Sequence, residues 1–522
     1  MLEQKRYKDS ETSFLNSLKI SPNNADTYTY LGRLYSEQKL FEQAEICYKN
    51  AITLQPSNER YLNNLGALYL NLKRYDVADH FYSNILKSEP QLADTFNNLA
   101  LLMLNKKNYS AAIGYCNKAL DINSTLASAY NNLGLIFLEQ KLFLEAENAF
   151  HEALLNKPLY ADANYNLGNL YQQQKRYDKA ESFYQNALEF QPDFIDARTN
   201  LAIMLLMLGR FKEGWVGYES RCHPDKHDRK TIPPAFKVPH WHGEPLIDKS
   251  MLIWAEQGIG DEVMFASCFN ELKNHQGKIT IACDHRLTKL FAQSFPFLVF
   301  IETDPSNHYL SLVDSLDYHC AIGSLPHFFR NDKKDFESTS SYLKVNQDLL
   351  SKWKQRYSQL KYSINIGISW RGGKDSHHQQ LRSIELSKWL PILKHEANFI
   401  NLQYGDHQSE INKFTDQTGI QIFDWDDANP LTDLDNFSAQ VKALDLVISI
   451  DNATVHFSGA LGVKTFALLP YQQEWRWMNK GDDSLWYPNT MKLFRQEEER
   501  DWSTVILDTT KALNKRVSLL ES

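Results

Sequence analysis

The stretch NNLGLIFLEQKLFLEAENAFHEAL, residues 131–154, decides the fold of the first part of the chain, because its pattern recurs every 34 residues. A Leu followed by Gly or Ala opens the pattern, a small residue comes in its second half, and a large residue, most often aromatic, follows four positions later. Small residues where two helices touch, with large ones beside them, indicate stacked pairs of antiparallel helices. The opening pairs are Leu31-Gly32, Leu65-Gly66, Leu99-Ala100, Leu133-Gly134, Leu167-Gly168 and Leu201-Ala202.

This period is the tetratricopeptide-repeat (TPR) pattern. Five full units run from about Ala25 to about Phe194, and the first 24 residues fit the second helix of an incomplete unit. A sixth unit starts at Ile195 and fades after Gly214. No unit can bury its apolar face alone, so we expect an α-helical TPR solenoid over residues 1–215. Such arrays bind extended polypeptide in their concave face, which makes another protein the expected partner.

Asparagines also recur every 34 residues, immediately before the Leu on the first helix of each unit, which lines the inner groove. A side-chain amide offers a donor and an acceptor together, which suits the backbone of a bound peptide. The set resembles the asparagine ladder with which O-GlcNAc transferases grip acceptor protein. Ordinary repeat packing is the alternative, because Asn is common at this position in TPRs generally. The five asparagines of this ladder are Asn64, Asn98, Asn132, Asn166 and Asn200.

Composition narrows the class of protein. The chain has 522 residues, a net charge of −8 and a pI near 6.1, which argues against nucleic acid as the main partner. Its six cysteines show no close pairing, as is usual in a reducing compartment. The N-terminus lacks the apolar segment of a secretory signal, and no apolar stretch is long enough to cross a bilayer. We therefore expect a cytoplasmic protein that does not span a membrane.

Prolines accumulate and the helical period disappears between Arg221 and Ser250, which predicts a linker over residues 216–249. We expect Trp241 to anchor this linker against the next domain. The spacing of its Cys and His residues fits no standard set of zinc ligands, so we expect no metal site. These residues are Cys222, His223, His227, His240 and His242.

After Ser250 short apolar strands alternate with helices, which is typical of parallel sheets. Two such blocks predict two Rossmann-like domains facing across a cleft, over residues 250–350 and 351–522. We expect the tail, Ser503–Leu520, to be helical and to cross back onto the first block. The predicted strands are Met251–Ala255, Lys278–Ala282, Val299–Ile301, Ile364–Trp370, Asn398–Gln403, Gly419–Phe423, Asp445–Ile450 and Thr465–Leu469.

Two motifs follow strand ends, where open α/β sheets place their ligands. The first is Gly258-Ile259-Gly260-Asp261, whose glycines allow a sharp turn and whose Asp opens a helix. The second, Asp451-Asn452-Ala453-Thr454-Val455-His456, delivers the free amides of a helix N-terminus, which favour anions. Simple helix capping by Asp261 or Asp451 and a buried structural His456 are the alternatives.

Three further residues are candidate ligands of the same site. Arg371, in Trp370-Arg371-Gly372-Gly373, stands beside a glycine turn with Lys374 and Arg382 nearby, an arrangement suited to clamping phosphate. A solvated loop charge is the alternative. Gln403 ends a predicted strand, and Arg476 lies in the aromatic cluster Trp475-Arg476-Trp477, which otherwise indicates packing.

Together these motifs resemble a known family. Asp451-Asn-Ala-Thr-Val-His456 with Gly459-Ala-Leu-Gly462 resembles the donor motif D-T-x-x-x-H-x-x-(A/G)-A-x-G of heptosyltransferase-like glycosyltransferases. Gly258-Ile-Gly-Asp261 resembles their N-terminal loop. The strings WAEQGIGDEVMFAS, ISWRGG and LLPYQQEWRWM are similar to bacterial proteins that join TPRs to such a domain. Asn452 departs from the usual Thr or Ser, which keeps a hydrogen-bond donor at this position but changes its reach.

The resemblance implies the GT-B fold and inverting, metal-independent transfer of a sugar from a nucleotide-sugar, which is a substrate and not a cofactor. It implies that Asp261 is the catalytic base. The residues expected to bind the donor are Gly258, Gly260, Arg371, Gln403, Asp451, Asn452, Thr454, His456 and Arg476. Arg371 and His456 would offset charge on the leaving group. The acceptor would be a protein held by the TPR groove, with a bacterial surface or flagellar protein as one candidate.

Two other functions remain open at this point. In the first, the chain is a TPR scaffold joined to a nucleotide-binding domain that no longer reacts. In the second, the enzyme acts on a glycan such as the lipopolysaccharide core, although a carbohydrate acceptor needs no long helical groove.

Overall fold

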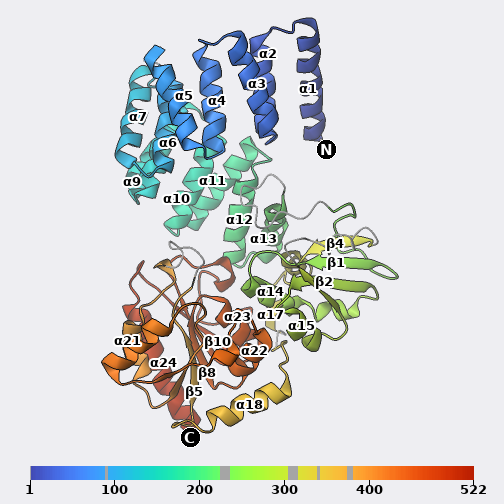
Figure 1. Cartoon of the computed structure of the whole chain (residues 1–522), viewed down its shortest axis with the longest axis vertical. Coiled ribbons are helices and arrows are strands. Elements are labelled where there is room, and N and C mark those ends of the chain that lie inside the picture. Colours follow the sequence, from blue (N-terminus) through green and yellow to red (C-terminus); the bar gives the residue numbers. More distant parts are fainter. Residues whose placement is uncertain are drawn as a thin grey trace. The chain divides into compact units, whose positions relative to one another are not determined.

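The computed structural model describes residues 2–88, 92–223, 236–303, 316–337, 341–372 and 380–521. The chain divides into two compact units, Met1–Phe194 and Ile195–Ser522. The first unit consists of helices and the second of helices and sheets (Figure 1). Each unit is described by itself below.

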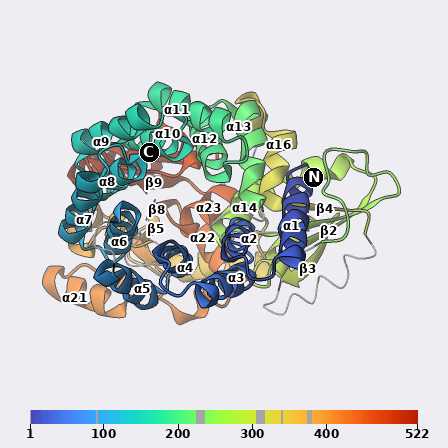
Figure 2. The same cartoon turned by 90° about the horizontal axis from the view of Figure 1, so that it is seen from above.

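The first unit is a succession of helices in which each odd-numbered helix from α3 packs against the helix before it. Seen from above, these helices follow one another around an arc (Figure 2). The small residues of the repeat lie where the helices touch: a Cβ atom added to Gly168 would lie 2.6 Å from the Tyr184 ring. The helices are α1 (Leu2–Ile20), α2 (Ala25–Glu37), α3 (Phe41–Leu54), α4 (Glu59–Asn71), α5 (Tyr75–Ser88), α6 (Ala93–Asn105), α7 (Tyr109–Ile122), α8 (Ala127–Glu139), α9 (Phe143–Asn156), α10 (Ala161–Gln173) and α11 (Tyr177–Phe190).

The sixth helix pair, α12 (Ile195–Met207) and α13 (Phe211–Tyr218), belongs to the second unit. The Trp215 indole donates to the Arg330 carbonyl at 2.7 Å, and its ring contacts that of Trp475 edge-on. These contacts explain why the compact unit ends at Phe194, whereas the sequence predicted a solenoid extending to residue 215. Residues 216–222, expected in a linker, complete α13 and a 3₁₀ turn, Glu219–Cys222.

The described part of the first sheet contains four parallel strands in the order β3-β2-β1-β4. Three of them match predicted strands, whereas the short β4 was not anticipated. The strands are β1 (Ser250–Trp254), β2 (Lys278–Asp284), β3 (Val299–Thr303) and β4 (Tyr318–Ala321). The accompanying helices are α14 (Ile259–Phe265), α15 (Thr288–Ser294), α16 (Leu325–Phe329) and α17 (Lys334–Glu337).

The second sheet, as far as the structure describes it, has six parallel strands in the order β10-β9-β8-β5-β6-β7. The chain runs outward from β5 to β7, then crosses to β8, so the strand order reverses between β5 and β8. Open α/β sheets bind ligands at such a reversal. The strands are β5 (Asn365–Ser369), β6 (Asn398–Asn401), β7 (Ile422–Phe423), β8 (Leu446–Ile450), β9 (Thr465–Leu469) and β10 (Met491–Arg495). β10 was not anticipated.

The helices of the second sheet are α18 (Gln347–Tyr357), α20 (Leu390–Leu393), α21 (Gln408–Thr418), α22 (Leu434–Lys442), α23 (Ala453–Ala460) and α24 (Ser503–Glu521). The tail helix α24 buries Val505, Ile506 and Leu513 in the core of this sheet, so the expectation that it crosses back onto the first block is wrong. Helix α18 starts before residue 351 and packs on α22, where the Trp353 indole donates to Asn436 at 2.7 Å. We call the part of the second unit built on the four-stranded sheet the first lobe and the part built on the six-stranded sheet the second lobe. The second lobe therefore begins before the predicted boundary at residue 351.

Candidate functional site

The loops after β1 and β8 meet inside the second unit, because helices α14 and α23 pack directly on each other. Gly260 permits this approach: an added Cβ atom would lie 2.9 Å from the His456 ring and 3.4 Å from the Ala453 Cα atom. The two motifs singled out in the sequence thus come together, one from each sheet.

Asp261 lies in the first turn of α14 and is paired with Arg476. The distance between Asp261 Oδ1 and Arg476 Nη2 is 2.7 Å, and the two side chains are only 15% and 11% exposed. The other carboxylate oxygen accepts a 3.2 Å hydrogen bond from the Gly258 amide. Asp261 therefore has both a local capping role, as the alternative interpretation held, and a partner from the opposite lobe.

Arg476 is surrounded by carboxylates on its other sides as well. Burial alone would lower the pKa of its guanidinium, but Asp261, Glu474 and Asp451 together raise this pKa above the usual range. Asp451 is buried, and burial raises the pKa of its carboxyl against the opposing effect of Arg382, whose Nη1 atom lies 3.8 Å away. Arg382 also forms an ion pair with Glu474. We call Asp261, Asp451, Glu474, Arg382 and Arg476 the charged cluster.

His456 lies against this cluster as a neutral ring. Burial, followed by the charge of Arg476, holds its pKa well below the usual value. Arg476 Nη1 lies 3.4 Å from His456 Nε2, and His456 Nδ1 lies 2.9 Å from the Tyr487 hydroxyl. Because a guanidinium can only donate, we assign the ring proton to Nδ1. The expectation that His456 offsets charge on a leaving group stays a prediction.

Asn452, and not Asp451, caps helix α23. Its Oδ1 atom accepts from the Thr454 amide at 2.9 Å, and its Nδ2 atom donates to Ser369 Oγ at 2.7 Å and to the Arg371 carbonyl at 3.1 Å. One side chain thus closes the helix N-terminus and ties the loop after β8 to the loop after β5. Thr454 is buried in the same turn.

Arg371 and Gln403 lie beside the reversal point but outside the charged cluster. Gln403 Oε1 accepts from the amides of Trp370 at 3.0 Å and Arg371 at 2.8 Å, which fixes the turn. The Arg371 guanidinium donates to the Asp406 carbonyl and lies 3.4 Å from Glu410. The backbone of Arg371 therefore lies beside Asn452, whereas its guanidinium contacts Asp406 and Glu410. Gly373, Lys374 and residues 375–379 lie outside the described residues.

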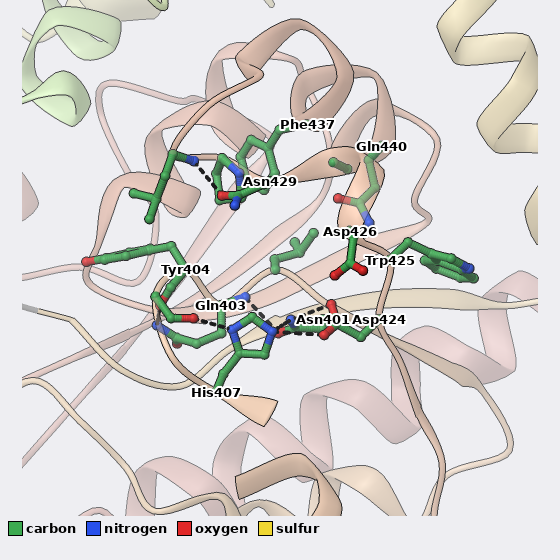
Figure 3. Close-up of a pocket in the computed structure, with 15 residues that line it drawn as sticks. Asn401, Gln403, Tyr404, His407, Asp424, Trp425, Asp426, Asn429, Phe437 and Gln440 are labelled. Carbon is green, nitrogen blue, oxygen red and sulfur yellow. Dashed lines mark hydrogen bonds and ion pairs between the residues drawn. The ribbon is translucent and has the colours of Figure 1, made fainter. Parts of the chain in front are cut away.

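A separate pocket opens beyond Gln403, over the ends of β6 and β7 (Figure 3). Its cavity volume is about 180 Å³. Tyr404 lies on one side and Trp425 on the opposite side, with His407 and Asp424 between them. The amide-bearing side chains that line it are Asn401, Gln403, Asn429 and Gln440. Aromatic and amide groups around a small cavity suit a planar, hydrogen-bonding ring.

His407 and Asp424 form an ion pair within this pocket. The distance between His407 Nε2 and Asp424 Oδ2 is 2.9 Å, and the hydrogen bond raises the pKa of the histidine. The other ring nitrogen lies 2.6 Å from the Gly405 carbonyl, and Asn401 donates to the second Asp424 oxygen at 2.8 Å. Only Gln403 of this pocket was a candidate from the sequence, because its other polar residues belong to no motif.

Sequence reasoning also missed Glu474 and Tyr487, and noted Arg382 only as a neighbour of Arg371. Glu474 stands two residues before Arg476, and charged residues so close to one another were the available signal. Within the described ranges, no group of three or more His, Cys, Asp or Glu side chains could hold a metal ion. His227 of the predicted linker lies outside these ranges.

In the first unit the asparagine ladder links neighbouring repeats. The Nδ2 atoms of Asn98, Asn132 and Asn166 each donate to an asparagine 35 residues earlier, at 3.1, 2.8 and 2.9 Å. Asn132 and Asn166 are buried, whereas Asn64 and Asn98 are partly exposed, as is Asn200 on α12 of the second unit. For Asn98, Asn132 and Asn166 this geometry matches the alternative interpretation, which is ordinary packing between repeats. Peptide binding by the ladder stays a prediction.

Comparisons with known proteins agree with the helical part of this description. Residues 13–46, 59–92, 93–125 and 161–194 match sequence models described as Tetratricopeptide repeat. The first unit is a TPR solenoid. In solved structures, the chain is similar to TTC0263, a thermophilic TPR protein of Thermus thermophilus, with 20% identity over 35% of this chain and 99% of that one, at a TM-score of 0.33. It is also similar to YrrB, a TPR protein with an unusual peptide-binding site, with 23% identity, coverage of 35% and 95%, and a TM-score of 0.24.

Among curated proteins, the chain is similar to Protein FlbA of Caulobacter vibrioides. The two are 30% identical over 322 residues, which cover 58% of this chain and 52% of FlbA. The chain thus spans about half the length of this relative. No helix among the described residues is both long enough and apolar enough to cross a membrane.

Proposed function

We propose that the chain is a glycosyltransferase of the GT-B type, which transfers a sugar from a nucleotide-sugar to a protein bound by the TPR solenoid. The observation that carries this proposal is the pairing of Asp261, from the first lobe, with Arg476, at the carboxyl-end loops of the second. A carboxylate and a guanidinium at the junction of two parallel sheets provide a base and an anion-binding group in one place.

The donor would bind to the second lobe. The pocket lined by Tyr404, Trp425 and the four amides would take the planar base of the nucleotide. The diphosphate would lie toward the reversal point, where Arg382 and Arg476 supply positive charge. Guanidinium groups suit this task because they contact phosphate oxygens in pairs and stay charged when buried.

Asp261 would act as the general base. The acceptor hydroxyl gives its proton to the carboxylate while its oxygen forms the bond to C1 of the sugar. The bond from C1 to the diphosphate breaks, and the leaving nucleotide keeps the electron pair. The arginines offset the charge that develops on it, an effect worth several kcal/mol in a dry site. Transfer by this single displacement inverts the anomeric centre.

The test is transfer and donor hydrolysis by the full chain, with a panel of UDP-, GDP-, CDP-, dTDP- and ADP-sugars and cell extract as the acceptor source. We expect Asp261→Asn to lower the rate by about 10²- to 10⁴-fold, because a positioned base contributes that much. Asp284→Asn is the matched control, since Asp284 also ends a first-sheet strand, β2, but pairs with Arg286 at 2.7 Å. Full activity in Asp261→Asn would remove the assigned base, and no reaction with any donor would favour the scaffold function.

A further inference from the structure

The guanidinium of Arg476 has two partners and one donor that is left over. Nη2 contacts Asp261, Nη1 contacts His456, and Nε is buried without a hydrogen-bond partner among the described residues. A buried donor without a partner is costly in a folded protein, which suggests that a ligand completes its bonding. The group is thus placed to contact more than Asp261.

A chain of hydrogen bonds fixes the direction of this guanidinium. Arg476 donates to His456 Nε2, and His456 Nδ1 donates to the Tyr487 hydroxyl. Tyr487 interacts electrostatically with the buried Tyr342, whose hydroxyl donates to the Val263 carbonyl of α14 at 2.8 Å. The hydrogen-bonded chain therefore begins at the charged cluster and ends next to a tyrosine that is bonded to the helix carrying Asp261.

Arg476 is the cation on which the charge balance of Asp261 depends. Tyr218, Tyr487 and Glu262 also interact electrostatically with Asp261, and none of these three carries positive charge in any protonation state. On its other sides Arg476 meets Glu474 and Asp451, which already share Arg382. An additional anion near Arg476 would therefore compete directly with Asp261.

We propose that Arg476 is shared between Asp261 and the diphosphate of the donor, and that His456 is the positioning residue that holds it between the two. This inference rests on the proposed function. With no donor bound, the arginine neutralises the carboxylate. A bound diphosphate forms its own ion pair with the guanidinium, which then no longer pairs with Asp261. Asp261 can then accept the proton of the acceptor hydroxyl. The base is therefore available only when a donor with its sugar is bound.

The experiment measures binding and needs no known acceptor. Isothermal titration of the full chain with UDP, GDP, CDP, dTDP and ADP first finds the nucleoside diphosphate that binds. With that nucleotide, Asp261→Asn should bind about tenfold tighter than the natural chain, because the competing anion is gone. Arg476→Gln should bind at least tenfold more weakly, and Asp261→Asn should have no effect in the Arg476→Gln background. Asp284→Asn should leave binding unchanged.

Equal or weaker binding by Asp261→Asn overturns the shared arginine. If the natural chain binds none of the five nucleotides, the proposed function fails, which is a different result. If Arg476→Gln does not fold, Arg476→Lys is used in its place, since lysine keeps the charge but loses the paired contacts. In the Arg476→Lys background, the increase in nucleotide affinity caused by Asp261→Asn should be smaller than in the natural chain.

Two substitutions of His456 test its positioning role. His456→Gln keeps an acceptor and should preserve the tenfold effect of Asp261→Asn. His456→Leu has no acceptor and should abolish the effect. A general loss of packing would instead lower affinity alike with and without Asp261. An unchanged effect in His456→Leu would show that Arg476 needs no help from the histidine.

Discussion

The two compact units bury polar groups of different kinds. The first unit buries neutral side chains, which are Thr27, Thr29, Thr95, Asn131, Asn132, Asn164 and Asn166. The second also buries ionisable ones, which include Arg221, Glu256, Glu262, Arg330, Asp451 and His456. Amides repeated every 34 residues satisfy one another along a stack, whereas a buried charge needs one particular partner. A repeating structure can provide amide partners at every unit, whereas the single partner of a buried charge requires a unique tertiary structure.

The test with the largest expected effect removes the arginine of one ion pair in each unit, buried in the second unit and exposed in the first. Arg221 Nε donates to Glu256 at 3.0 Å, and the side chains are 2% and 0% exposed. Arg221→Met should cost about 3–5 kcal/mol of unfolding free energy, because the buried Glu256 loses its counter-ion and keeps the neutral Gly323 amide as a donor. Arg33→Met is the control in the first unit, where the pair with Glu37 is 73% and 47% exposed and is worth less than about 1 kcal/mol.

Denaturant unfolding can separate the two units. All 11 tryptophans lie between Trp215 and Trp502, so tryptophan fluorescence reports only on the second unit. Circular dichroism follows the helices of both. Equal losses for Arg221→Met and Arg33→Met would contradict the comparison.

The second test is the pH dependence of stability. Burial raises the pKa of the Glu262 carboxyl to about 8, and its Oε2 atom accepts from the Asp284 amide at 3.1 Å. Since the folded pKa lies above the unfolded one, this carboxyl destabilises the fold as the pH rises from about 4.5 to about 8. Glu262→Gln should therefore be more stable than the natural chain, by on the order of 2 kcal/mol above pH 8.

The measurement is the fluorescence-detected melting temperature of Glu262→Gln and the natural chain between pH 4.5 and pH 9. The difference should grow with pH across this range. Glu302→Gln, on an exposed part of β3, should show no such trend. A constant difference between Glu262→Gln and the natural chain would mean that the carboxyl does not stay protonated in the folded protein.

The smallest effect on stability is expected from a substitution in the asparagine ladder. Asn166→Ala removes the 2.9 Å bond to Asn131 and should cost about 1 kcal/mol, because one neutral hydrogen bond is lost. The loss should not change with pH or salt, since neither partner is charged. Circular dichroism during denaturation would detect it, and a marked salt dependence would argue that the ladder is coupled to charges. If Asn64→Ala, at a partly exposed position of the ladder, weakens acceptor binding without this loss, the peptide role gains support.

The repeats could be predicted from sequence because their contacts recur at a fixed spacing. A Leu-Gly pair and the aromatic residue that covers the glycine lie on adjacent helices, as Gly168 and Tyr184 do. The positions of Asp261 and Asn452 were also predictable, since both follow apolar strands and the ends of parallel strands meet at one edge.

The partners of these residues were not predictable. The pairing of Asp261 with Arg476 joins two loops far apart in the chain, and it depends on how two sheets pack through α14 and α23. The protonation state of His456 follows from its burial beside Arg476, which no motif encodes. His407 and Asp424 come from two loops with no recognisable pattern, and they meet only because β6 and β7 are neighbours.

The pocket of Figure 3 draws all its lining from one uninterrupted stretch, Asn401 to Gln440, whereas the charged cluster gathers residues from both lobes. A segment of this kind can be exchanged between related chains by a single recombination event. Under the function proposed above, exchange of this segment between related chains would change which donor is recognised and leave the Asp261–Arg476 pairing untouched, a consequence that chimaeras can test.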